Sequence, residues 1–226
     1  NEKYTFNGVE SVLKEYFGEI EMKDLLADVL ITSYDLGTRR PFFFKSEKAR
    51  KDPKRNPLVW QAARATSAAP TYFEPYRLET DDELTYYSLI DGGVFANNPS
   101  MCAYAEVTRM GYHNLFFTSL GTGEMSAQSI EHDKAKDFGV LQWIKPLIDI
   151  MMDGNSDTVS YQMSQVLEEG GSEYIRLQAS LNKDNADMDN VKESNVRQLK
   201  IAARNLIEDN AKEIKRICNV LKQSEA

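Results

Sequence analysis

Short apolar runs rich in β-branched and aromatic residues alternate with longer amphipathic stretches, and this alternation constrains the fold more than any other feature of the chain. The runs with strand character are "VLITSYD", "FFFKS", "TYYSLI", "NLFFTSL" and "YIRLQAS". Helical patterns separate most of them, and buried strands separated by helices are typical of a parallel sheet covered on both faces. The sequence therefore predicts an α/β fold, a three-layer α/β/α sandwich with a mainly parallel central sheet.

Capping residues, glycine and proline predict where several helices begin and end. Asn7, with Glu10 three residues later, has the pattern of a capping box, and Gly18 is a typical helix stop. Asn98-Pro99 predicts a helix start with proline at the first helical position. The later helical patterns cover residues 138–154 and 155–170, then approximately Val191 to Glu208 and Asn210 to Lys222.

The length and apolar content of the chain suit one domain. It has 226 residues, of which 42% are hydrophobic, which is enough to bury one core. We expect a single domain over residues 1–226, with the sheet and its flanking helices in approximately 1–180 and C-terminal helices in approximately 181–226. No stretch approaches the roughly 18 consecutive apolar residues of a membrane span.

Charge and cysteine content exclude several classes of protein. The formal net charge is −8 and the pI is about 5.0, whereas a nucleic-acid-binding protein usually carries a basic surface. Cys102 and Cys218 are too few for a disulfide framework and show no metal-ligand spacing. We therefore expect two buried thiols, no nucleic-acid partner, no metal or other cofactor, and a cytoplasmic location.

The stretch "LIDGGVFANNPSMCAYAEV", residues 89–107, places a carboxylate where a buried strand ends. In open α/β sheets, chemistry gathers at the carboxyl ends of strands. Asp91 has three possible roles there: metal ligand, general base, or a cap or turn residue for the helix that begins near Asn98. Gly92 and Gly93 permit positive φ and a close approach of another backbone or of a ligand.

The asparagine pair that follows has two interpretations. Asn97 and Asn98 lie between Asp91 and the predicted helix start. Their side chains can steady the Asp91 loop through bonds to the backbone, or they can cap the following helix. The sequence leaves both interpretations open.

Three motifs in a fixed order resemble one known family. They are "ARATSAAPTYFEP" from Ala63, "LIDGGVFANNPSMCAYAEV" from Leu89, and "FTSLGTGE" from Phe117. Together they resemble the patatin-like phospholipases, a family of lipid acyl hydrolases, and the similarity extends over nearly the whole chain. The resemblance implies hydrolysis of phospholipids or other acyl lipids by a serine–aspartate dyad without a cofactor.

The same resemblance assigns the site residues. It makes Asp91 the base of the dyad, with Gly92, Gly93, Asn97 and Asn98 as supporting residues of its motif. A transient contact with a membrane surface is an expected consequence of a lipid substrate. An aspartate of ordinary pKa near 3.9 is a weak base at neutral pH, so this dyad needs a buried carboxylate in a fixed geometry.

The nucleophile expected from the resemblance is missing from these residues. The chain has no Gly-x-Ser-x-Gly elbow and no glycine-rich oxyanion loop. Around Ser119, Phe117 replaces the first glycine and would clash in a tight elbow, while Ser67 lies in a run of small residues explained by packing. In the family both motifs precede this region. We therefore expect the C-terminal portion of a patatin domain, inactive alone, with a companion N-terminal segment that carries the serine.

Two other functions remain open at this stage. The first is a non-catalytic lipid-binding or storage protein on the same scaffold. The second is a different α/β enzyme that uses Asp91 for metal or phosphate chemistry. His113 and His132 lie in polar stretches and are expected at the surface, and Gly121-Thr122-Gly123 is expected to form a turn after a strand.

Two further segments have a distinctive composition. Residues 45–55 form a predicted basic loop with six basic and two acidic side chains, which is either a solvated loop or a contact for anionic headgroups. Residues 138–152 include a broad set of apolar side chains, expected to lie mostly in the core, with an acyl-chain channel as the alternative. That set is Phe138, Val140, Leu141, Trp143, Ile144, Leu147, Ile148, Met151 and Met152.

Overall fold

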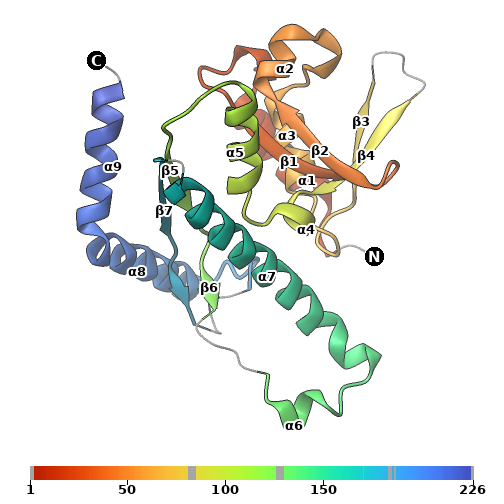
Figure 1. Ribbon diagram of the computed structural model, residues 1–226. Coiled ribbons are helices and arrows are strands. Elements are labelled where there is room, and N and C mark those ends of the chain that lie inside the picture. The colour runs from red at the N-terminus through yellow and green to blue at the C-terminus, as the bar shows by residue number, and fades with distance from the viewer. Residues whose placement is uncertain are drawn as a thin grey trace. The chain divides into compact units, whose positions relative to one another are not determined.

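The computed structural model describes residues 3–80, 85–125, 130–169, 171–182, 185 and 187–224 (Figure 1). The chain forms two compact units, Asn1–Ala103 and Tyr104–Ala226. Helices and sheets together place the chain in the α/β class, as predicted, whereas the three-layer sandwich is not confirmed. The predicted single domain with a division near residue 180 stays a prediction.

The first unit is built on a four-stranded sheet in the order β2-β1-β4-β3. Its strands are β1 (Leu30–Asp35), β2 (Arg40–Lys45), β3 (Tyr76–Glu79) and β4 (Tyr86–Asp91). All three pairings are antiparallel. The predicted mainly parallel sheet is therefore wrong for this unit. A connection of only a few residues, such as the one between β1 and β2, permits only an antiparallel pair, because a parallel pair needs a long crossover.

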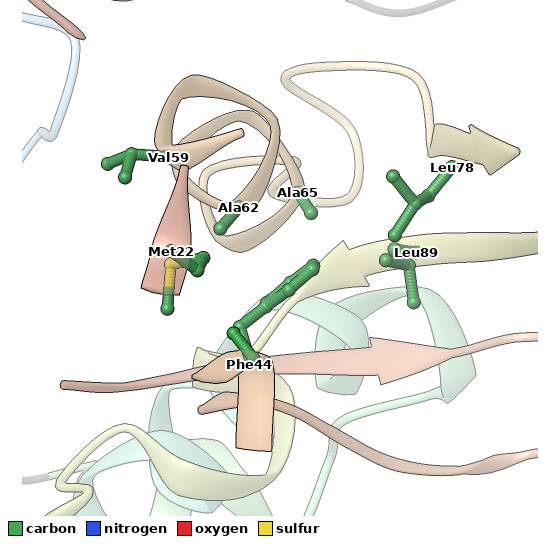
Figure 2. Packing of buried hydrophobic residues seen from close by; sticks show 8 residues of the cluster. Met22, Phe44, Val59, Ala62, Ala65, Leu78 and Leu89 are labelled. Atoms are coloured by element: carbon green, nitrogen blue, oxygen red, sulfur yellow. The ribbon is translucent and has the colours of Figure 1, made fainter. Parts of the chain in front are cut away.

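The helices of the first unit are α1 (Phe6–Phe17), α2 (Ser46–Lys51), α3 (Val59–Thr66) and α4 (Gly93–Ala96), with short 3-10 turns η1 (Met22–Asp24) and η2 (Pro53–Arg55). Helices α3 and α4 pack on the sheet, whereas α1 packs on α3 and α2 packs on η1. Figure 2 shows side chains of α3 pointing toward those of the strands. The core cluster consists of Met22, Phe44, Ala49, Val59, Ala62, Ala65, Leu78 and Leu89. Ala62 and Ala65 are fully buried, and their small side chains let α3 lie close to the sheet.

The ends of α1 test two sequence predictions. Gly18 follows the helix with a φ of 50° and donates its N–H to the Lys14 carbonyl, so the predicted stop is confirmed. The predicted cap at Asn7 is wrong. The helix begins one residue earlier, at Phe6, with Thr5 at the N-cap position, which places Asn7 inside the first turn.

The second unit contains two parallel strand pairs and the longest helix. β5 (Phe116–Leu120) pairs with β7 (Glu173–Leu177), and β6 (Glu124–Met125) pairs with β8 (Ser180–Leu181). The helices are α6 (His132–Ala135), α7 (Val140–Glu169), α8 (Glu193–Asp209) and α9 (Ala211–Ser224). Helix α5 (Ser100–Arg109) contains the boundary between the two units, which falls after Ala103. The predicted strands near residues 114–120 and 174–180 and the two C-terminal helices are thus confirmed.

Helix α7 differs from its prediction in two ways. It is one continuous helix of 30 residues with Pro146 inside it, not two helices. The expectation that its first half lies in the core is also wrong. Its buried side chains include Met163 and Leu167 near the other end, whereas Val140, Leu141, Ile144, Leu147, Ile148 and Met151 are exposed. An apolar periodicity identifies a helix face but does not determine which element covers it.

Two smaller findings complete the description. Cys218 is exposed and Cys102 is half-buried, so the prediction of two buried thiols is wrong for Cys218, which lies on the solvated side of α9. Within the part of the chain that the structure describes, no helix is long and apolar enough to cross a membrane.

Asp35 ends β1 and organises the turn that leads into β2. Its carboxylate accepts hydrogen bonds from the N–H of Gly37, from the N–H and hydroxyl of Thr38, and from the N–H of Ser88 on β4. Burial by itself raises the pKa of Asp35, but these four donors outweigh it, and the pKa lies below its ordinary value. This carboxylate therefore joins a turn to the neighbouring strand in its ionised form.

The turn that follows β4 packs directly on β1. A Cβ at Gly92 would lie 2.2 Å from the Thr32 hydroxyl oxygen and 2.4 Å from the Thr32 carbonyl oxygen. Gly92 has a φ of −68°, and Gly93 is not among the glycines with positive φ. Neither glycine uses the positive φ that the sequence permits, and the close approach of another backbone is the reason that position 92 lacks a side chain.

The first prediction concerns Asp35→Asn, which we expect to reduce the free energy of unfolding by about 1–3 kcal/mol at neutral pH. An amide has one acceptor oxygen, so it leaves some of the four donors, from Gly37, Thr38 and Ser88, without their acceptor. Because the folded pKa is lowered, wild-type stability falls as the pH drops from the unfolded-state value toward the folded-state value. The difference between the two proteins should therefore shrink in acid. Urea unfolding at several pH values measures this, and a difference independent of pH would contradict it.

The second prediction concerns Gly92→Ala. The new methyl group would overlap the Thr32 backbone, which cannot move without disturbing β1, so we expect destabilisation of at least about 1–3 kcal/mol. Gly8→Ala is the matched control, because a Cβ at Gly8 in helix α1 meets nothing within 4 Å. That control should be neutral or stabilising by up to about 1 kcal/mol. Thermal unfolding of both variants decides, and equal effects would refute the argument.

Candidate functional site

Asp91 is the last residue of β4, and hydrogen bonds fix both its backbone and its side chain. Its N–H donates to the Ala68 carbonyl, just beyond the end of α3, at 3.0 Å. Its carboxylate atom Oδ1 accepts the N–H of Gly93 at 2.7 Å. The Gly93 bond folds the side chain back over the start of α4. Among the described residues, no other hydrogen bond to this carboxylate is present.

The surroundings of Asp91 make its carboxylate more basic than an ordinary aspartate. Burial raises its pKa, and the single bond from Gly93 offsets only part of that effect. Asp35, at the end of the neighbouring strand, has the opposite balance, because four donors lower its pKa. Of these two strand-end aspartates, Asp91 is therefore the one prepared to accept a proton.

The end of α3 links Asp91 to the strand beside it. The Thr66 hydroxyl donates to the Thr32 carbonyl at 2.7 Å, and that carbonyl abuts Gly92. Together with the bond from Asp91 to Ala68, this contact joins the segment that begins at Ala63 to the segment that begins at Leu89. Sequence analysis found both motifs but not Thr32 or Thr66. No local pattern marks these two residues, since their roles arise from contacts between distant segments.

Aromatic side chains pack beside the Asp91 turn. Phe95 on α4 contacts Tyr34 of β1, with ring centroids 6.3 Å apart, and Phe43 of β2 at 5.8 Å in an edge-to-face arrangement. These rings come from three elements of the first unit. The rings thus pack α4, which follows Asp91 directly, against β1 and β2.

The asparagine pair has the geometry of a helix cap. Asn98 is 1% exposed, and its Oδ1 accepts the N–H and the hydroxyl of Ser100. Asn97 is exposed and lies at the end of α4. Pro99 lies directly before α5, and its carbonyl accepts the first helical hydrogen bond, from Ala103. This geometry favours the capping interpretation for Asn98, and a direct role for the pair in steadying Asp91 stays a prediction.

Two serines near Asp91, Ser33 beside it on β1 and Ser67 just after α3, direct their hydroxyls elsewhere. The Ser33 hydroxyl donates to the Ile90 carbonyl, and the Ser67 hydroxyl donates to carbonyls within α3. Ser119 lies in the second unit, is 7% exposed and accepts a hydrogen bond from Arg176. No hydrogen bond joins a described serine to the Asp91 carboxylate.

Other residues weighed from the sequence lie in the second unit. His113 and His132 are exposed there, as predicted. Gly121-Thr122-Gly123 follows β5, and Gly123 has a φ of 112°, which fits the predicted turn. Within the described ranges, no three His, Cys, Asp or Glu side chains are grouped so that they could hold a metal ion.

Comparison with known proteins matches the site-bearing unit to one family. Residues 1–104 match the family described as "Patatin-like phospholipase". The chain is 33% identical over 181 residues to "Patatin-like protein 6" of Arabidopsis thaliana, covering 76% of this chain and 36% of that protein. It is 30% identical over 226 residues to "Patatin-like protein 1" of Oryza sativa subsp. indica, covering 87% and 54%.

A third relative carries a different description. The chain is 31% identical over 193 residues to "Probable inactive patatin-like protein 9" of Arabidopsis thaliana, covering 80% of this chain and 50% of that protein. The chain thus spans between about a third and just over half of the length of these three relatives. The matched region contains Asp91, Gly92 and the asparagine pair. Through residues 1–104, this chain belongs to the patatin-like phospholipase family.

Proposed function

We propose that the protein carrying this chain hydrolyses the acyl esters of lipids, as a phospholipase A or lysophospholipase, with Asp91 as the catalytic base. Membership of the patatin-like phospholipase family supports a lipid acyl hydrolase at the level of the family. The observation that carries the residue assignment is the half-buried carboxylate of Asp91, which has a raised pKa and one hydrogen-bond donor. Such a group can take a proton from a hydroxyl that is brought beside it.

The proposed reaction passes through an acyl-enzyme. A serine hydroxyl attacks the ester carbonyl while Asp91 accepts the hydroxyl proton. The ester C–O bond breaks, and the leaving alcohol takes that proton. Water then attacks the acyl carbon while Asp91 accepts a proton from it. The bond between that carbon and the serine oxygen breaks, the serine oxygen takes the proton back from Asp91, and the fatty acid is released.

The nucleophile and the oxyanion donors are proposed to lie in a companion segment outside these residues. The chain contains no Gly-x-Ser-x-Gly, and Ser33, Ser67 and Ser100 direct their hydroxyls to acceptors other than Asp91. Strands of that segment would extend the small sheet of the first unit toward the predicted three-layer sandwich. We also propose a cytoplasmic location, because a low cysteine content fits a reducing compartment.

A non-catalytic lipid-binding protein on the same scaffold is the second candidate. Two of the relatives are named as probably inactive, one from Arabidopsis thaliana and "Probable inactive patatin-3-Kuras 1" of Solanum tuberosum. The contacts of Thr66, Gly92 and Asn98 serve packing and capping, so a protein without hydrolase activity would also need them. The two functions therefore differ at the dyad and not in the scaffold.

The third prediction concerns Asp91→Asn in the intact protein. We expect ester hydrolysis to fall by about 10²–10⁴-fold, because an amide cannot accept the serine proton. For the wild type, kcat/KM should rise with pH as Asp91 loses its proton, with a midpoint above the ordinary aspartate value near 3.9, because burial raises the pKa of Asp91. Initial rates on a soluble ester across a pH series measure both effects.

Measurements of stability distinguish Asp91→Asn, which changes the proposed base, from a variant that weakens the fold. A raised folded-state pKa means that ionised Asp91 lowers stability as the pH rises through that value. Asp91→Asn should therefore be as stable as the wild type, or more stable, at neutral pH. Asp35→Asn is the control, since it should lose stability and retain activity at temperatures where it is folded. Undiminished hydrolysis by Asp91→Asn would refute the assignment.

The fourth prediction concerns the 226-residue chain by itself. We expect no ester hydrolysis and no labelling by a fluorophosphonate probe, which reacts only with an activated serine. The intact protein should be labelled and active, and its Asp91→Asn variant should be labelled far more slowly. Labelling of a serine within residues 1–226 would contradict the proposed division of the dyad, and an intact protein that resists the probe would favour the non-catalytic candidate.

A further inference from the structure

Six cations lie on α2, on η2 and at the end of β2, on a protein that is acidic elsewhere. The group consists of Lys45, Lys48, Arg50, Lys51, Lys54 and Arg55, and we call it the basic surface. Only Glu47 and Asp52 oppose it within residues 45–55, whereas the whole chain has a net charge of −8. This is a local reversal of sign.

The backbone beneath the basic surface is fixed. The Ser46 N–H donates to the Val29 carbonyl at 3.0 Å, and the Ser46 hydroxyl accepts the Val29 N–H at 2.8 Å. Ala49 is buried in the core, and the Asp52 side chain caps η2 by accepting the Lys54 N–H. The predicted loop is therefore wrong for residues 46–55, since two short helical elements hold these cations in place.

Three cations of the basic surface are available for a partner. Arg50 is paired with Asp28, and Lys51 with Glu47. Lys48, Lys54 and Arg55 are exposed and form no ion pair within the described part of the chain. The adjacent η1 carries Lys23, which is paired with Glu21, and the exposed carboxylate of Asp24. The basic surface therefore keeps a net positive charge when the neighbouring carboxylates are included.

The topology of the sheet places the basic surface at the same edge as Asp91. β2 and β4 are each antiparallel to β1, which lies between them, so both run in the same direction and end at one edge. Lys45 ends β2 opposite Leu30, and Asp91 ends β4 opposite Ser33. Leu30 and Ser33 are three residues apart along β1, so the positions of Lys45 and Asp91 differ by roughly 10 Å in the direction of the strands.

Direct contacts connect the two sites. The Lys45 ammonium lies 5.3 Å from the centre of the Phe43 ring, and that ring packs on Phe95 with centroids 5.8 Å apart. Phe95 belongs to α4, which begins two residues after Asp91. On the same short helix, Val94 is 43% exposed and offers an apolar side chain beside the Asp91 turn.

We propose that the basic surface binds the anionic face of a phospholipid bilayer and so presents the Asp91 edge to the lipid. This inference rests on the proposed function and names the surface on which that function takes place. The free cations are spread over two successive elements, α2 and η2, which suits many headgroups on a plane better than one phosphate ion. The acidic remainder of the protein is repelled by the same plane, which orients the molecule.

The fifth prediction tests this with the intact protein and two kinds of vesicle. Vesicles of phosphatidylcholine with about 30% phosphatidylserine should bind the wild type, and binding should weaken with added sodium chloride. Each basic side chain near an anionic plane strengthens binding about fivefold. The triple variant Lys48→Gln, Lys54→Gln and Arg55→Gln should therefore bind these vesicles roughly a hundredfold less tightly in co-sedimentation.

The matched control removes three cations elsewhere. Lys212→Gln, Lys215→Gln and Lys222→Gln change exposed side chains of α9 and should leave binding within about twofold of the wild type, and circular dichroism checks the fold of both variants. Equal loss in both triple variants, or equal wild-type binding to pure phosphatidylcholine vesicles, overturns the proposal.

Free phosphate is the remaining competitor. If sodium phosphate displaces the protein better than sodium chloride of equal ionic strength, the surface is a phosphate site and the proposal fails. Hydrolysis of a soluble ester by the wild type is measured separately. Its absence would refute the proposed function, whatever the vesicles show.

Discussion

The contact between the Gly92 backbone and the Thr32 carbonyl is the constraint on which the candidate site depends. It presses the turn after β4 against β1 so closely that no side chain fits. The Thr66 hydroxyl donates a hydrogen bond to the same carbonyl. With the bond from Asp91 to Ala68, this contact fixes the base at a strand end, where burial and a single donor keep its carboxylate basic.

Two aspartates at strand ends show how one residue type serves stability or chemistry. Asp35 receives four hydrogen bonds, which favour its charged form and stabilise the turn. Asp91 receives one, so its charged form is poorly compensated for the water it has lost. A carboxylate in the second situation costs stability at neutral pH, and such a cost persists where a function requires it.

Local patterns in the sequence predicted much of the chain but not its pairing. Strand composition located β4 and placed Asp91 at its end, and Gly18 marked the end of α1. Composition cannot distinguish parallel from antiparallel neighbours, and the short connection between Asp35 and Arg40 was the available sign that β1 and β2 form a hairpin. β3 was not predicted, because Tyr76–Glu79 is short and alternates with charged residues.

A second group of predictions failed because the burial of a side chain depends on which neighbouring element covers it. The apolar positions of Val140 to Met151 were identified correctly as one helical pattern, yet their exposure depends on neighbouring elements that periodicity does not reveal. The contacts of Thr32 and Thr66 were missed for the same reason, since each joins segments about 30 residues apart or more. The candidate base could be predicted from its motif, whereas the shell that holds it could not.

The antiparallel pairing in the first unit decides which strand ends lie together, and this matters for the proposed function. Because β1 lies between β2 and β4 and runs against both, the ends of β2 and β4 lie at one edge. Lys45 and Asp91 therefore lie at the same end of the sheet, although 45 residues separate them along the chain. Had β2 been parallel to β1, its last residue would lie at the opposite end, with the Asp35 turn. The strand order and direction thus connect a group of cations to a candidate base, and a lipid bound by the first would lie at the end of the sheet that carries the second.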